Sequence, residues 1–203
     1  MKEKLELRMY GLVPYNISEI QKGIQFGHAV VEYGQKMKYY GVHQQLSGEQ
    51  YDDWANNWKT FIILNGGTSN HSQNRYHQFE DEFVGTMESN LLSLKDAGIT
   101  TAEFYEPDLN DMLSAIVFVV DERVFNKKDY PEFEDWVIEN YGGLLKVDPE
   151  NYNTIGKTQK QLAQMIKESE NPRDRKVYNK WVDFIGGEKN AFLREFLKNF
   201  RLA

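Results

Sequence analysis

The run of apolar residues from Ala115 to Val120 constrains the fold more than any other segment of the chain. A strand that lacks alternating polar residues is buried on both faces, so other elements must cover it on each side. A polar and acidic stretch, Glu106 to Asp111, leads directly into this run. We therefore expect a covered strand whose entry point carries charged side chains.

Strands and helices alternate along the first 121 residues. Apolar and charged residues alternate from Leu5, which predicts a half-buried strand that extends to about Val13. Further strands are predicted over 61–64, 101–105 and 114–120. This alternation predicts an α/β fold: a three-layer sandwich in which helices cover both faces of a mixed sheet of roughly four strands.

Two long helices and one short helix are predicted between these strands. The first begins at a capping box of Ser18 and Gln21, and we expect its apolar stripe to pack on the sheet, with two glycines allowing close approach. That stripe consists of Ile20, Ile24, Gly27, Val31 and Gly34. A short helix is predicted over 51–57, after a second capping-box pattern at Ser47 to Gln50. The second long helix presents Phe83, Met87, Leu91 and Leu94 and ends at Gly98.

The pattern becomes entirely helical after Asp121. Pro131 is expected to open a helix that Gly142 and Gly143 close, and helical periods recur over 158–169, 173–185 and 188–201. No strand is predicted in this region. We therefore expect an α/β domain over 1–122 and an α-helical extension over 123–203.

Composition excludes several classes of site. The 203 residues include no cysteine, which excludes disulfides and thiolate metal sites and fits a reducing cytoplasm. The charged start and the lack of a long apolar run predict a soluble intracellular protein without a membrane partner. Gly66 and Gly67 lack the remaining residues of a nucleotide-binding fingerprint, and His71 and His77 form a poor metal site. We expect neither a cofactor nor a metal.

Charge is distributed unevenly along the chain. The net charge is −7, but residues 1–122 contain 9 basic and 18 acidic residues, whereas residues 157–201 contain 11 basic and 6 acidic ones. A nucleic-acid partner requires a basic patch rather than a basic whole. On a helix, Arg173, Lys176 and Lys180 share one face, opposite Val177, Trp181 and Phe184. This basic face is either a solvated surface over a core face or a surface that binds the phosphates of a nucleic acid.

Four segments carry a resemblance to a known family. They are, in order, Gln25–Ala29 with its Gln-x-x-His-Ala pattern, Trp58–Leu64, Leu91–Ile99 and Phe104–Asn110. From Leu5 to about Asp121 the chain resembles the type 2 peptidyl-tRNA hydrolases, and more closely a bacterial and phage branch of them. The resemblance implies an enzyme that hydrolyses the ester between a peptide and tRNA.

The resemblance also implies a catalytic cluster. The Gln-x-x-His-Ala pattern faces the active site in the family, so His28 becomes a candidate general base and Gln25 a residue that orients a substrate carbonyl or a ribose hydroxyl. Without the resemblance, His28 would be a packed histidine. Glu106 and Asp108 replace the family's Asp-Ala-Gly, and one of them is expected to orient the histidine or polarise a water. Ser114 takes the place of a threonine that starts the last family strand, where it either donates to the substrate or holds the loop by local hydrogen bonds.

Lys22 marks a departure from the family pattern. Type 2 hydrolases typically carry Lys-Gly-Lys six residues before the glutamine, with lysines implicated in activity. In an ungapped match, Glu19 and Gln21 occupy those positions, and Lys22 is displaced by three residues. Lys22 therefore either reaches the cleft from the next turn or is a surface lysine.

Two hypotheses about function follow. The first is a peptidyl-tRNA hydrolase with His28, Glu106 or Asp108, Gln25, Ser114 and Lys22 at its site. The second is a non-catalytic binding or regulatory protein on the same scaffold, for instance one carried by a phage, which acts on a protein or nucleotide partner. A protein partner would bind through the helical extension, and the sequence is also compatible with a homodimer.

Overall fold

The computed structural model describes residues 4–40, 45–69, 85–142 and 157–203. The chain forms two compact units: Met1–Glu122 together with Phe196–Ala203, and Arg123–Glu195. The expected division was 1–122 and 123–203. The structure instead adds the segment from Phe196 to the C-terminus to the first unit, because this segment pairs with a strand there.

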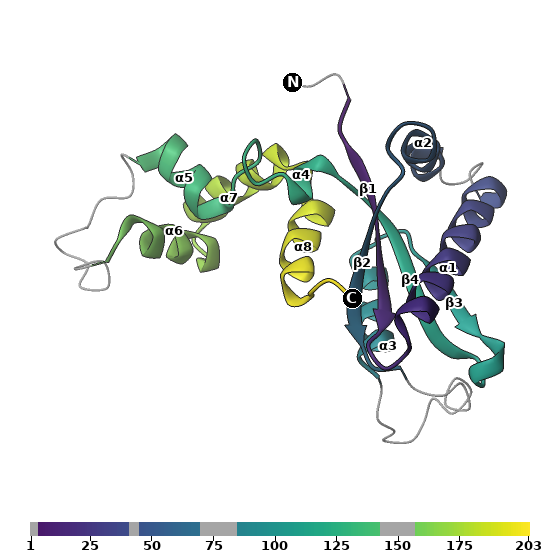
Figure 1. Ribbon diagram of the computed structural model, residues 1–203. Coiled ribbons are helices and arrows are strands. Elements are labelled where there is room, and N and C mark those ends of the chain that lie inside the picture. The colour runs from purple at the N-terminus through teal and green to yellow at the C-terminus, as the bar shows by residue number, and fades with distance from the viewer. Residues whose placement is uncertain (1–3, 41–44, 70–84, 143–156) are drawn as a thin grey trace. The chain divides into compact units, whose positions relative to one another are not determined.

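The first unit is built around a four-stranded mixed sheet of order β2-β1-β4-β3 (Figure 1). The strands are β1 (Leu7–Pro14), β2 (Thr60–Gly67), β3 (Ala102–Glu106) and β4 (Met112–Asp121). β1 and β2 are parallel, and β4 runs antiparallel to both β1 and β3. The carboxyl ends of β1, β2 and β3 therefore meet the start of β4 at one edge of the sheet. The predicted α/β fold is confirmed.

The two central strands are buried along their length. Every residue of β4 is buried, as its apolar run predicted. β1 is also buried on both faces, so the prediction of a half-buried strand was wrong. The strand lies between β2 and β4, and helices cover both of its faces. The alternation that suggested an exposed face depends on Glu6, which precedes the strand, and on Arg8, whose Nε donates to Glu6 at 2.7 Å.

Two helices cover opposite faces of this sheet (Figure 1). Helix α1 (Glu19–Tyr40) packs on β1, β3 and β4, and α3 (Thr86–Asp96) packs on β1, β2 and β4. Of the predicted helix features, the capping box is confirmed, because Gln21 N donates to Ser18 Oγ at 3.3 Å and Ser18 N donates to Gln21 Oε1 at 3.2 Å. The predicted core face of α3 is confirmed for Met87, Leu91 and Leu94. Phe83 lies outside the described residues.

The buried face of α1 is not the predicted one. Ile20 and Val31, two members of the predicted stripe, are 78% and 61% exposed. The residues that face the sheet are Phe26, Ala29, Tyr33 and Met37. Gly11 in β1 makes this possible, since a β-carbon there would collide with the Phe26 ring. The predicted close approach of Gly27 and Gly34 to the sheet is also wrong: a β-carbon on Gly27 would meet nothing, and one on Gly34 would meet Tyr51.

The segment that precedes β2 is helical over a longer range than predicted. Helix α2 (Gln45–Asp53) continues into a π-helical turn, Trp54–Trp58. The Ser47 to Gln50 pattern therefore lies within the helix rather than before its start. Trp54 is buried, and its ring contacts the Phe61 ring at 5.4 Å between centroids. This packing holds the last turn in place before Lys59 adopts a left-handed conformation, with φ of 53°.

The second unit consists of helices with their own core. After the short α4 (Glu122–Phe125) come α5 (Phe133–Tyr141), α6 (Gln159–Glu168), α7 (Pro172–Phe184) and α8 (Glu188–Phe196). Their core contains Phe133, Trp136, Val137, Leu162, Trp181, Val182 and Ile185. Helix α7 ends at two glycines with φ of 91° and 107°, Gly186 and Gly187, and the N–H of Gly187 donates to Val182 O at 2.8 Å. The predicted helical segments are confirmed, except that the last α-helix ends at Phe196.

The C-terminal segment returns to the outer edge of β2. Leu202 forms an antiparallel bridge with Leu64. Asn65 N donates to Arg201 O at 2.9 Å, and Ala203 N donates to Ile63 O at 3.0 Å. The sequence predicted no β pairing after residue 122, and this bridge corrects that prediction. An edge strand presents unpaired main-chain groups, and the tail satisfies some of those of β2.

Candidate functional site

Three of the predicted site residues come together where α1, β3 and β4 meet. Glu106 is the last residue of β3, Ser114 lies near the start of β4, and Gln25 lies in the second turn of α1. These positions share one edge of the sheet, because β3 ends where β4 begins and α1 follows the carboxyl end of β1. The topology therefore explains how residues more than eighty positions apart become neighbours.

Gln25 forms the centre of this cluster. Its side chain is 5% exposed, and its amide bonds in two directions. The Ser114 hydroxyl donates to Gln25 Oε1 at 2.9 Å, and Gln25 Nε2 donates to the Glu106 carboxylate. Glu106 also accepts a hydrogen bond from Asp108 N at 3.4 Å. These contacts fix the amide orientation and leave one of the two Nε2 hydrogens for a further acceptor.

His28 lies beside this cluster and is exposed. Its ring stacks on the Phe104 ring, with centroids 4.5 Å apart and an interplanar angle of 19°. The carbonyl of Phe104 lies 3.2 Å from the Ser114 hydroxyl, so Phe104 contacts both the histidine and the polar cluster. Within the described residues, neither Glu106 nor Asp108 forms a hydrogen bond or an ion pair with the imidazole; they bond to Gln25 and to each other instead. The sequence analysis did not single out Phe104, although it stands in the motif that ends with Glu106 and Asp108.

The two remaining predicted residues lie at the margins of the cluster. The Lys22 side chain is buried, and its Nζ lies 2.8 Å from Glu19 Oε1, so its charge is paired within α1. Asp108 is exposed in the 3-10 turn Pro107–Leu109, and it contacts Glu106 through its main-chain N–H. The cluster thus offers an oriented amide donor, an accessible imidazole and an exposed carboxylate, which together suit hydrolysis of a carbonyl compound.

The predicted basic face lies on α7 in the second unit. Arg173, Lys176 and Lys180 are exposed, as a solvated or phosphate-binding surface requires. Lys180 is partly engaged, since its Nζ donates to the Tyr141 hydroxyl at 3.1 Å. Of the residues predicted to lie on the other face, Trp181 is buried and Val177 is half-buried, whereas Phe184 is exposed and follows Lys180 by one helical turn, so its predicted placement was wrong. Val182 and Ile185 belong to the buried core of the helical unit, whereas Phe184 does not.

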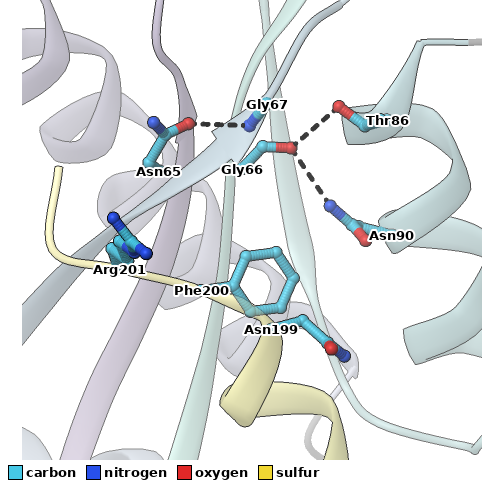
Figure 2. A pocket seen from close by; sticks show the side chains of 8 residues that line it. All are labelled: Asn65, Gly66, Gly67, Thr86, Asn90, Asn199, Phe200 and Arg201. Atoms are coloured by element: carbon cyan, nitrogen blue, oxygen red, sulfur yellow. Dashed lines mark hydrogen bonds between the residues drawn. The ribbon is translucent and has the colours of Figure 1, made fainter.

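A cavity of about 460 Å³ lies at the carboxyl end of β2 (Figure 2). It is lined by Asn65, Gly66, Gly67, Thr86, Asn90, Asn199, Phe200 and Arg201. β2 and β3 are the two outer strands of the sheet, so this cavity and the Gln25 cluster are separate features. The sequence analysis predicted none of these residues as a site. Two features of the sequence could have pointed to this cavity: the Gly66–Gly67 pair after a buried strand, and the basic C-terminal region.

Neither a metal centre nor a membrane span is found in the described part of the chain. Among those residues, no three His, Asp or Glu side chains are grouped closely enough to bind a metal ion. His71 and His77 lie outside the described residues. The described helices include none with the length and apolar character needed to cross a bilayer.

Comparisons with protein-family models, with curated proteins and with solved structures give no match to this chain.

Proposed function

We propose that the Gln25 cluster hydrolyses the ester that joins a peptide, or a blocked amino acid, to the terminal ribose of tRNA. The observation that carries this proposal is the pair of hydrogen bonds by which Ser114 and Glu106 hold the Gln25 amide, next to the exposed His28. Gln25, His28 and Glu106 come from segments in which the chain resembles the type 2 peptidyl-tRNA hydrolases, and Ser114 lies near the start of the strand that follows them. Ester hydrolysis needs a base and an oriented hydrogen-bond donor, and this cluster supplies both.

The reaction uses one water molecule. The His28 imidazole removes a proton from this water, and the resulting hydroxide oxygen attacks the carbonyl carbon of the ester. The free Nε2 hydrogen of Gln25 donates to the oxyanion that develops on the carbonyl oxygen. The bond between the carbonyl carbon and the ribose oxygen then breaks, and His28 returns its proton to that oxygen. Ser114 and Glu106 are positioning residues here, because they act through Gln25.

Binding of tRNA requires positive charge outside the first 122 residues, which carry twice as many acidic as basic side chains. Arg173, Lys176 and Lys180 supply three adjacent cations on the exposed face of α7. Each cation that neutralises a phosphate releases counterions, so this contribution falls as salt rises. We therefore assign binding of the tRNA backbone to this face of α7.

A non-catalytic binding protein is the second candidate, and Lys22 is the observation that favours it. Its ammonium is paired with Glu19 at 2.8 Å, and Glu19 stands where the family pattern has a lysine. A scaffold without free lysines at this helix start has lost groups that the family uses for activity. Such a protein would act on a protein or nucleotide partner, because fold alone does not define function.

Turnover of a purified N-blocked aminoacyl-tRNA by the intact protein tests the proposal. We expect release of the blocked amino acid, and we expect His28→Ala to lower turnover by about 10²-fold or more, as loss of a general base does. Gln35→Ala is the matched control, since Gln35 is an exposed residue of the same helix. It should leave turnover unchanged.

Two outcomes would contradict this assignment in different ways. Full turnover by a folded His28→Ala variant would exclude His28 as the base, and Lys22→Ala would be examined next. Absence of turnover by the wild-type protein, with tRNA binding retained, would favour the binding protein.

A further inference from the structure

We propose that the cavity at the carboxyl end of β2 binds a nucleoside monophosphate unit, that is, a planar base joined to a phosphorylated ribose. Its volume of about 460 Å³ lies within the range of roughly 300–1,000 Å³ that small-molecule sites occupy. Its lining combines side-chain amides, one aromatic ring and one cation. This combination suits a ligand with a hydrogen-bonding planar ring and a negative charge.

The asparagine side chains present a donor and an acceptor in fixed orientations. Asn65 Oδ1 accepts a hydrogen bond from Gly67 N at 3.0 Å, which leaves the Asn65 Nδ2 hydrogens as donors. Asn90 Nδ2 donates to Gly66 O at 3.1 Å, which leaves Asn90 Oδ1 as an acceptor. Figure 2 shows these two bonds on either side of the Gly66–Gly67 backbone. Nucleobase edges carry donors and acceptors side by side, so a base edge can bond with the amide on either side of this backbone.

Phe200 and Arg201 provide the stacking surface and the charge. In Figure 2 the ring of Phe200 stands between the side chains of Arg201 and Asn90. The ring is half-buried, and it contacts the Phe196 ring at 4.9 Å between centroids, with an interplanar angle of 56°. Base stacking on an aromatic side chain is favourable for every base. Arg201 is the only charged residue among the eight that line the cavity, and its guanidinium matches a phosphate.

The start of α3 does not supply the anion contact. The N–H of Met87 already donates to Thr68 O at 2.8 Å, and Thr68 N donates to Thr86 Oγ1 at 2.7 Å. The charge that recognises a phosphate therefore comes from Arg201. The backbone of Arg201 is held by Asn65 N at 2.9 Å, and the Leu202–Leu64 bridge holds the next residue. The cavity is complete only when the C-terminal tail lies on β2.

This inference does not rest on ester hydrolysis at the Gln25 cluster. The same ligand chemistry has two sources: a free nucleotide, or one nucleotide of a single-stranded RNA. Both present a base to Phe200 and the two asparagines and a phosphate to Arg201. Titration with free nucleotides and with a short RNA separates these sources, and it requires no aminoacylated tRNA.

Isothermal titration calorimetry of the full-length protein with AMP, GMP, CMP and UMP tests the proposal. We expect saturable binding of at least one of them. Arg201→Gln should weaken it about tenfold by removing a charged hydrogen bond, and Phe200→Leu should weaken it about tenfold by removing stacking. Asn65→Asp keeps the acceptor for Gly67 N but replaces the donor with a negative charge. It should weaken binding by about tenfold or more in a folded protein.

Inorganic phosphate and a tetranucleotide of RNA complete the experiment. Phosphate should bind more weakly than the nucleotide and should respond to Arg201→Gln but not to Phe200→Leu. Tighter binding of the tetranucleotide identifies single-stranded RNA as the source, and equal or weaker binding identifies the free nucleotide. Lys38→Gln changes an exposed cation on α1 and is the matched control, with affinity unchanged.

Three results would overturn the proposal. The first is the absence of saturable binding by all four nucleotides up to about 10 mM, a concentration well above a weak millimolar Kd. The second is nucleotide affinity that none of the three cavity variants changes. The third is a combination of two findings: inorganic phosphate binds as tightly as the nucleotides, and Phe200→Leu leaves nucleotide affinity unchanged. That combination would define a site for anions alone.

Discussion

Arg194 is a buried charged side chain in the helical unit. It is 1% exposed, and its guanidinium donates to the carbonyls of Arg123 and Tyr130, each at 2.8 Å. Its Nε lies 3.5 Å from Glu132 Oε2, and its guanidinium carbon lies 5.6 Å from the centre of the Trp181 ring. Burial lowers the pKa of Arg194 below its usual value, and Glu132 opposes that effect. The guanidinium thereby connects α8 with the segment before α5.

Arg194→Ala should destabilise the helical unit by about 3–5 kcal/mol, because it removes the donor to two carbonyls and one of the cations beside Glu132. Denaturant unfolding measures the loss, and hydrogen exchange should locate it within residues 123–195. Lys189→Ala, at an exposed position of the same helix, should change stability by no more than about 0.5 kcal/mol. Equal stability of the two variants would contradict the role assigned to Arg194.

Helix α1 shows why hydrophobic periodicity alone does not define which face of a helix is buried. Ile20, Ile24 and Val31 recur at helical spacing, and so do Phe26, Tyr33 and Met37. The second set faces the sheet, because Gly11 makes room for the Phe26 ring and Trp54 and Phe61 lie next to it. The same rotation places Gln25 against Ser114 and leaves His28 exposed.

Phe26→Ala should therefore lower the free energy of unfolding by about 3–5 kcal/mol, as truncation of a buried aromatic ring does. Ile20→Ser, at a position that is 78% exposed, should change it by about 0.5 kcal/mol or less. Chemical denaturation of both variants measures the difference. The reverse order would mean that the helix packs with the face that the sequence first suggested.

The whole molecule separates negative and positive charge along its length. The segment 1–122 contains 9 basic and 18 acidic residues, and the segment 157–201 contains 11 and 6. If the protein binds tRNA, the phosphates must be met by the basic part, since repulsion from the acidic part opposes binding. The exposed face of α7 is the assigned contact.

Changing Arg173, Lys176 and Lys180 together to Glu should weaken tRNA binding and flatten its salt dependence by about one log–log unit per lost phosphate contact. Titration with tRNA at two salt concentrations measures both effects. The control variant has Lys38, Lys128 and Lys189 changed to Glu, which alters the net charge by the same amount. Its tRNA binding should depend on salt more steeply than that of the α7 variant. Absence of tRNA binding by the wild-type protein at low salt would rule out the hydrolase.

Part of the candidate site could be predicted from the sequence, namely that Gln25, Glu106 and Ser114 meet. Residues at the start of a helix and at the ends of neighbouring strands converge in α/β topology, so their positions in the chain were informative. Their pairing was not predictable. The sequence analysis expected a carboxylate beside His28, whereas Glu106 bonds to Gln25 and His28 stacks on Phe104. Side-chain partners depend on distances of a few ångströms, which spacing along the chain does not define.

The sequence by itself determined the features that arise from local interactions. These are the alternation of strands and helices up to Asp121, the Ser18–Gln21 capping box, the core face of α3 and the helices that follow residue 130. Each depends on residues within a few positions of one another. Only the tertiary structure decided which face of α1 is buried, and that the last residues pair with β2 and complete a cavity. Those features depend on contacts between distant segments, and spacing along the chain does not define such contacts.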